Sequence, residues 1–85
     1  MGKYDPLAAF LSKQQAKEVT LSFEDIADED KIGIDLPRSA REYPEWWANE
    51  SSPKTRHKQC LAWRQAGWHV KHVDLPREFV VFERD

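Results

Sequence analysis

The chain has 85 residues, of which 40% are hydrophobic and 33% charged, and its formal net charge is −2 at pH 7. This length predicts a single domain over residues 1–85, with a small core to which the 12% of aromatic residues contribute strongly. No apolar run approaches the ~20 residues that a bilayer requires, the start lacks a secretory signal, and a lone cysteine forms no internal disulfide. We therefore expect a cytoplasmic protein without a membrane partner.

The first half of the chain predicts two helices around one strand. Asp5 and Pro6 form a helix start, with Asp5 as the cap, and the apolar residues after them have i, i+3, i+4 spacing. Residues 18–23 alternate as a short strand. Ser22 and Asp25 have the spacing of a capping box, so a second helix should follow the strand directly.

The middle of the chain predicts two short helical pieces. Ser39 and Glu42 have the spacing of another capping box. Pro44 lacks the N–H that would bond back to Ala40, so a helix that begins here should be interrupted and the sequence PEWWAN should form a second piece.

The last part of the chain predicts a longer helix and a hairpin. Ser52-Pro53 is a start signal, good helix formers continue to Ala66, and Gly67 is a natural terminating residue. Residues 68–75 and 78–84 are two β-rich runs, with a short loop around Pro76 and Arg77 between them, and they predict an antiparallel hairpin.

The expected order is helix, strand, helix, a helix that Pro44 can break, helix, strand, strand, which gives an α+β fold. We interpret it as a small domain of winged helix-turn-helix type, with three to four helices and a three-stranded antiparallel sheet. The helix Pro53–Ala66 would occupy the recognition position and the hairpin would be the wing.

Several motifs also resemble a family of small uncharacterised bacterial domains. They are KYDPL at the start, VTLSFEDI, LPRSAREYPEWWAN, and AWRQAGWHVKHVDL followed by VVFER. The resemblance covers residues 3–84, with Cys60 and Arg64 as departures from the pattern. It implies a stand-alone domain or an accessory module of a larger protein and carries no established activity.

The charge distribution indicates a nucleic-acid-facing side. Residues 1–37 carry 4 basic and 8 acidic side chains, whereas residues 38–85 carry 9 basic and 7 acidic ones. Such a dipole can orient a protein on a polyanion, although both regions are also explained as solvated faces. The expected partner is double-stranded DNA. The residues predicted to contact it are Lys54, Arg56, His57, Lys58, Gln59, Arg64, Lys71 and Arg77.

A protein-interaction module is the alternative, in which an acidic face or an exposed tryptophan holds a protein partner. At least two of the four tryptophans should belong to the core. Trp46 and Trp47 are adjacent and would point about 100° apart on a helix, so one of them should be partly exposed. Trp47, with Asn49, is the predicted partner-binding pair.

Neither a metal site nor an enzyme is expected. His57 and Cys60 could share a helix face, but His69 and His72 would point to opposite sides of a strand. Cys60 lies on the apolar side of its helix, which favours a buried structural thiol. The acidic residues between 24 and 35 mostly precede or cap a helix, so a solvated face is preferred over a small metal-dependent nuclease. No cofactor is expected.

Overall fold

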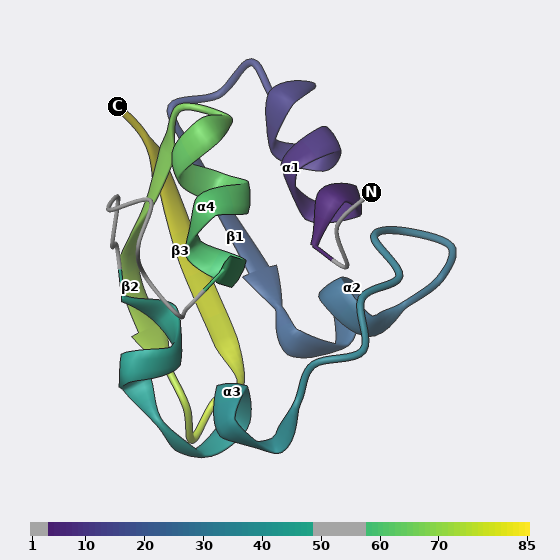
Figure 1. Ribbon diagram of the computed structural model, residues 1–85, viewed down its shortest axis with the longest axis vertical. Coiled ribbons are helices and arrows are strands. Elements are labelled where there is room, and N and C mark those ends of the chain that lie inside the picture. Colours follow the sequence, from purple (N-terminus) through teal and green to yellow (C-terminus); the bar gives the residue numbers. More distant parts are fainter. Residues whose placement is uncertain (1–3, 49–57) are drawn as a thin grey trace.

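A computed structural model describes residues 4–48 and 58–85, which form an α+β fold with a three-stranded antiparallel sheet and four α-helices (Figure 1). The predicted α+β class is therefore confirmed. The elements in chain order are α1 (Asp5–Ser12), β1 (Glu18–Ser22), α2 (Phe23–Ala27), α3 (Arg38–Glu42), the 3-10 helix η1 (Pro44–Trp47), α4 (Lys58–Gln65), β2 (Trp68–Asp74) and β3 (Phe79–Arg84). Within these residues, every helix falls short of the length and apolarity that crossing a bilayer demands.

The strand β3 lies at the centre of the sheet, between β1 and β2, and pairs antiparallel with both. Its residues Val80 and Phe82 are fully buried and pair with Leu21 and Val19 of β1. Because side chains alternate along a strand, these residues define the inner face and their neighbours point to the outer face. The predicted C-terminal hairpin is confirmed, and β2 carries a register shift at Lys71.

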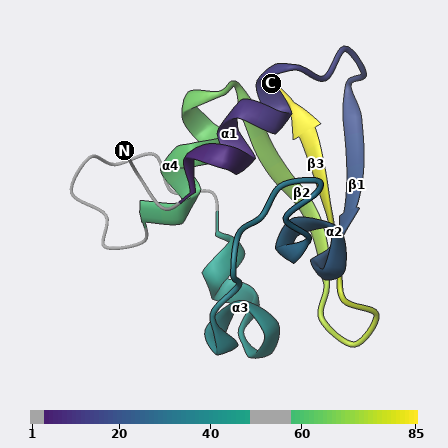
Figure 2. The same ribbon diagram turned by 90° about the vertical axis from the view of Figure 1, so that its right-hand side faces the viewer.

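The helices α1 and α4 contact each other on the inner face of the sheet (Figure 2). The core between them and the strands contains all four tryptophans, each with at most 8% of its surface exposed. The expectation that at least two tryptophans are core residues is confirmed. Cys60 is fully buried beside them, as expected for a structural thiol.

Two of the predicted helix caps are wrong. Tyr4, and not Asp5, is the N-cap of α1, and Asp5 lies in the first turn. The helix α3 begins after Pro37, and no side-chain cap bond from Ser39 to the backbone of Glu42 is present in this described part of the chain. Residue type at Asp5 and spacing at Ser39 predict these caps, whereas the actual cap position depends on where the chain turns before the helix.

The capping box of α2 is confirmed. The Ser22 hydroxyl accepts a hydrogen bond from the N–H of Asp25, and the Asp25 carboxylate accepts one from the N–H of Ser22. The ammonium group of Lys31 also donates to Asp25 at 2.6 Å, and this bond is the main cause that lowers the pKa of the carboxyl group. The acidic turn after β1 is thus explained by local structure.

Gly67 ends α4 with a positive φ of 84°, as predicted for a terminating glycine. A Cβ atom at this position would meet no heavy atom within 4 Å. We therefore expect Gly67→Ala to cost only the backbone strain, about 1–2 kcal/mol in urea denaturation. Gly67→Asn should cost less, because asparagine adopts this conformation more readily. Equal stability of the alanine variant and the wild type would contradict this explanation.

Candidate nucleic-acid interface

The predicted interface is the helix Pro53–Ala66, assisted by the hairpin. We define its first part as the cationic segment, residues 51–58, which has the sequence SSPKTRHK and no carboxylate. The structure places its two flanks: the chain runs into it from η1 and Ala48, and leaves it through α4. The predicted site residues that lie outside the described residues are Asn49, Lys54, Arg56 and His57, together with the side chain of Lys58.

Gln59 was predicted to reach base edges, and this prediction is wrong. Only 6% of its surface is exposed, and its Nε2 donates a hydrogen bond to the carbonyl oxygen of Trp46 at 2.9 Å. A buried amide that satisfies a backbone carbonyl is not free to extend into a groove. Gln59 instead joins the first turn of α4 to η1.

Arg64 is tied to the end of the chain. Its Nη1 donates to the carbonyl oxygen of Trp68 at 3.2 Å and to Oδ1 of Asp85 at 2.9 Å. His69 contacts the same carboxylate atom at 2.6 Å through Nδ1. The hydrogen bonds with His69 and then with Arg64 lower the pKa of Asp85. The guanidinium group of Arg64 therefore has a carboxylate partner already.

Lys71 lies on the outer face of the sheet, away from α4. Its Nζ donates to Glu18 at 2.9 Å and is 3.5 Å from Glu83. The bond to Glu18 is the main cause that raises the pKa of Lys71. The ammonium group of Lys71 is therefore paired with two carboxylates on the outer face of the sheet.

Arg77 lies in the turn between β2 and β3, and 81% of its side chain is exposed. Its Nε is 3.9 Å from Asp74, which is a weak ion pair. Arg77 also lines a cavity of about 540 Å³ between this turn, α2 and α3. Arg41 and Glu78, which also line this cavity, pair at 2.8 Å.

The three described cations of the prediction each have a carboxylate partner within 4 Å, which is Asp85 for Arg64, Glu18 for Lys71 and Asp74 for Arg77. Arg64 bonds to the start of β2, Arg77 follows the end of that strand, and Lys71 lies on the outer face of the sheet. These carboxylates partly neutralise Arg64, Lys71 and Arg77, and contact of the three cations with DNA stays a prediction.

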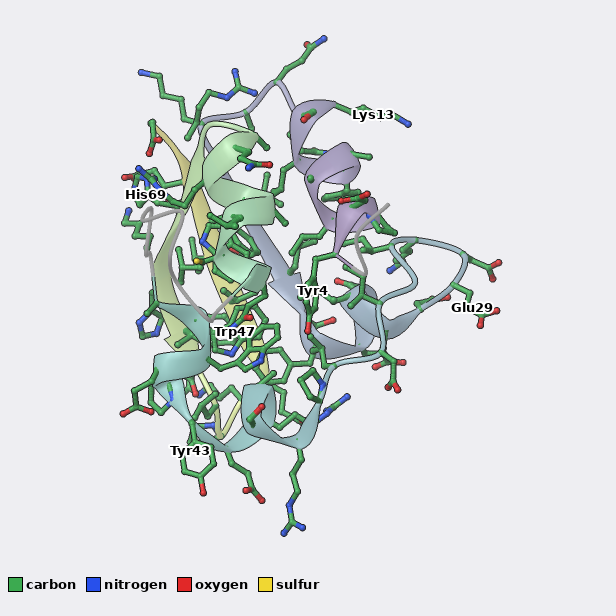
Figure 3. All side chains as sticks on the ribbon, viewed as in Figure 1. Tyr4, Lys13, Glu29, Tyr43, Trp47 and His69 are labelled. Atoms are coloured by element: carbon green, nitrogen blue, oxygen red, sulfur yellow. The ribbon has the colours of Figure 1, made fainter. Side chains whose placement is uncertain are left out.

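Trp47 was predicted to be an exposed partner-binding residue, and its exposure is only 2%. Its ring stacks on Phe23 and Trp63, with centroids 5.4 and 6.0 Å apart, and Figure 3 shows it inside the fold. Its Nε1 donates to the carbonyl oxygen of Ala40 at 2.8 Å. Trp47 is a core residue, so the prediction of an accessible ring is corrected.

The aromatic side chain that is exposed is Tyr43. With 56% of its surface accessible, it is the exposed large hydrophobic residue of the described part, and it points away from the body of the fold (Figure 3). Pro44 holds the backbone of Tyr43 extended, with ψ of 119°, but this local signal does not predict the exposure of its side chain. Tyr43 borders the tyrosine cavity, a hollow of about 430 Å³. The residues that line it are Ser39, Tyr43, Glu45, Trp46 and Gln59.

Together these features define a small α+β domain whose sheet is covered on one face by helices and whose tyrosine cavity is lined in part by Gln59 of α4. Among residues 4–48 and 58–85, no group of three or more His, Cys, Asp or Glu side chains is arranged to hold a metal ion. The model of a family described as a domain of unknown function (DUF7662) matches residues 4–85, so the chain belongs to this family. No curated protein and no solved structure matches the chain.

Proposed function

We propose that the protein is a DNA-binding module of winged-helix type, without enzymatic activity, that serves in regulation or in a defence system. The observation that carries the proposal is the continuity of the cationic segment with α4, the helix directly before the β2–β3 hairpin. In helix-turn-helix proteins a helix in this position enters the major groove, and a following hairpin serves as the wing.

The sheet topology supports the same type of fold. The early strand β1 joins the hairpin through β3, so the order is β1-β3-β2, which is the arrangement expected for a winged domain. The inner side of α4 is fixed by Cys60 and Trp63, both fully buried. A helix anchored in this way has a stable orientation relative to the hairpin that follows it.

Arg64, Lys71 and Arg77 already have carboxylate partners, so we place the proposed main contact toward the start of α4. Lys54, Arg56 and Lys58 have no carboxylate among their sequence neighbours in the segment 51–58. Phosphate binding by such cations releases counterions and gives affinity that falls with salt. Arg77 and Lys71 serve as secondary contacts at most. Exposed ion pairs are each worth only about 0–1 kcal/mol, so a phosphate can readily replace the carboxylate partner.

The test is a charge reversal with a matched control. We expect the wild type to bind a short labelled DNA duplex at low salt, as measured by fluorescence anisotropy. Lys54→Glu combined with Arg56→Glu should weaken binding strongly and reduce the dependence of log K on log salt by about two. The control is Lys13→Glu with Lys17→Glu, which makes the same change in net charge at two exposed positions after α1. It should retain most of the affinity.

Two results would contradict the proposal. One is the absence of any salt-dependent duplex binding by a folded wild-type protein. The other is an equal loss of affinity in the segment variant and in the Lys13/Lys17 control, because general charge, and not the segment, would then govern binding. Circular dichroism spectra of all variants exclude unfolding as the cause.

A protein partner is the second candidate, favoured by the acidic first part of the chain, where residues 1–37 carry 4 basic and 8 acidic side chains. An acidic surface repels phosphates and attracts a basic protein. A tight complex with a protein that survives high salt, together with no duplex binding, would support this function in place of the first.

A further inference from the structure

The two edges of the sheet are built differently. The edge strand β2 carries a register shift at Lys71, η1 contacts it, and the guanidinium group of Arg64 donates to the carbonyl oxygen of Trp68. A bulge, an edge lysine and a covering element are devices that keep a strand edge from pairing with another chain. The edge strand β1 is regular in register and contains no proline, and Figure 2 shows it along the margin of the fold.

The pairing of β1 with β3 decides which backbone groups of β1 face its open side. The carbonyl oxygen of Lys17 accepts from the N–H of Arg84 at 2.7 Å, and the N–H of Phe23 donates to the carbonyl oxygen of Glu78 at 2.8 Å. Bonding direction alternates along an antiparallel pair, so the odd-numbered residues between these two also bond toward β3. The residues whose N–H and C=O groups point away from β3 are therefore Glu18, Thr20 and Ser22.

Glu18 and Thr20 keep their open-side backbone groups unpaired. The N–H of Ser22 is closed to a new partner, because it donates to the Asp25 carboxylate in the capping box of α2. No hydrogen bond from residues 4–48 or 58–85 reaches the N–H and C=O groups of Glu18 and Thr20, and both residues are exposed. An extended chain beside β1 can bond to these groups and add a fourth strand to the sheet, as in peptide recognition by β-augmentation.

The chain along and after this edge is acidic. Residues 18–30 contain six carboxylates and no cation. Glu18 pairs with Lys71, and Asp25 pairs with Lys31. The carboxylates of this stretch that form no ion pair with any cation of residues 4–48 and 58–85 are Glu24, Asp28, Glu29 and Asp30. Glu29 points away from the body of the fold (Figure 3). Because opposite charges attract and like charges disfavour association, this stretch selects a basic chain.

We infer that the β1 edge binds an extended, basic segment of a protein partner as a fourth strand. This inference goes beyond the proposed DNA contact, which lies at the start of α4, since the two surfaces belong to different elements. Backbone hydrogen bonds to Glu18 and Thr20 hold the segment, and its lysine or arginine side chains meet the acidic stretch. A partner protein is thereby joined to the module without use of the helix α4.

The first test is amide hydrogen exchange with a blocked heptapeptide of alternating valine and lysine as the probe. In the free protein, the amide protons of Val19 and Leu21 should exchange slowly and those of Glu18 and Thr20 rapidly. A peptide concentration of about ten times Kd should slow exchange at Glu18 and Thr20 about tenfold, because these amides exchange only from the free form. The matched peptide of alternating valine and glutamate should bind at least about tenfold more weakly.

The second test removes one open-side donor. Proline is accepted in an edge strand where the N–H faces solvent, so Thr20→Pro leaves the ladder to β3 intact. This variant should weaken binding of the valine–lysine peptide about 2- to 10-fold, the effect of one lost hydrogen bond. Thr20→Val is the matched control, because it keeps the N–H and the β-branched shape, and it should bind like the wild type. Slow exchange at Val19 and Leu21 checks that the proline variant is folded.

The outcomes separate this inference from the proposed function. Absence of peptide binding, binding that leaves Glu18 and Thr20 unprotected, or equal affinity for the two peptides overturns the β1 assignment, and so does a folded Thr20→Pro variant with wild-type affinity. Each of these results leaves the DNA-binding proposal standing. If Thr20→Pro does not fold, the exchange pattern of the wild type decides. Peptide binding at β1 in a protein that binds no duplex supports this inference and overturns the proposed function alone.

Discussion

Trp63→Ala is expected to leave the protein largely unfolded, or close to unfolding, at room temperature. Trp63 is fully buried, and its ring lies 6.0 Å from that of Trp47 and 5.5 Å from that of Phe82. Truncation of a buried tryptophan costs about 3–5 kcal/mol, because the transfer energy is lost and a cavity remains. The total stability of a domain of 85 residues is about 4–13 kcal/mol.

The measurement is urea denaturation followed by far-ultraviolet circular dichroism. Tyr43→Ala is the matched control, because it also removes an aromatic ring but from an exposed position, and it should change stability by less than about 0.5 kcal/mol. A Trp63→Ala variant with a midpoint close to that of the wild type would show that the ring does not hold α4 on the sheet.

The elements were predictable because their signals are local. The capping box of Ser22 and Asp25, the interruption at Pro44 and the glycine at position 67 each act within one turn of the chain, and all three are present. The order of the elements then followed from the sequence alone. A sheet formed by the early strand and the hairpin was also expected, whereas the pairing of β1 with β3 in particular comes from the structure.

The burial of both adjacent tryptophans was not predictable from a helical wheel. The segment Pro44–Trp47 is a 3-10 helix, and its two rings contact each other with centroids 4.6 Å apart and both contact Trp63. Trp46 packs edge-on against Tyr4 with centroids 5.8 Å apart, whereas Trp47 stacks on Phe23. Tertiary packing decides which side chain is exposed. The exposed aromatic side chain is that of Tyr43, and not that of Trp47 as expected.

The ionic partners of the predicted cations were also hidden from sequence reasoning. Lys71 bonds to Glu18, which is 53 residues away, and Arg64 bonds to Asp85, which is 21 residues away. A stretch free of carboxylates in the sequence is therefore not free of them in space. Only the pairing of β1 and β2 across β3 brings Glu18 near Lys71.

Trp47→Phe is expected to destabilise the protein by at least about 2 kcal/mol. In a continuous helix the carbonyl oxygen of Ala40 would accept from the residue at position 44, but Pro44 has no N–H. The indole Nε1 of Trp47 supplies the donor instead, at 2.8 Å in a buried position. Phenylalanine keeps a ring but leaves this carbonyl oxygen unpaired, which costs about 1–3 kcal/mol, and the smaller ring adds a cavity term.

The control for the hydrogen bond is Phe23→Leu, which reduces a ring of the same buried stack without removing any polar atom. Urea denaturation should show a smaller loss for this variant than for Trp47→Phe. An equal or greater loss would mean that volume, and not the bond to Ala40, sets the cost. Because Trp47 is buried, any effect of Trp47→Phe on a partner should follow the loss of stability and vanish where both proteins are fully folded.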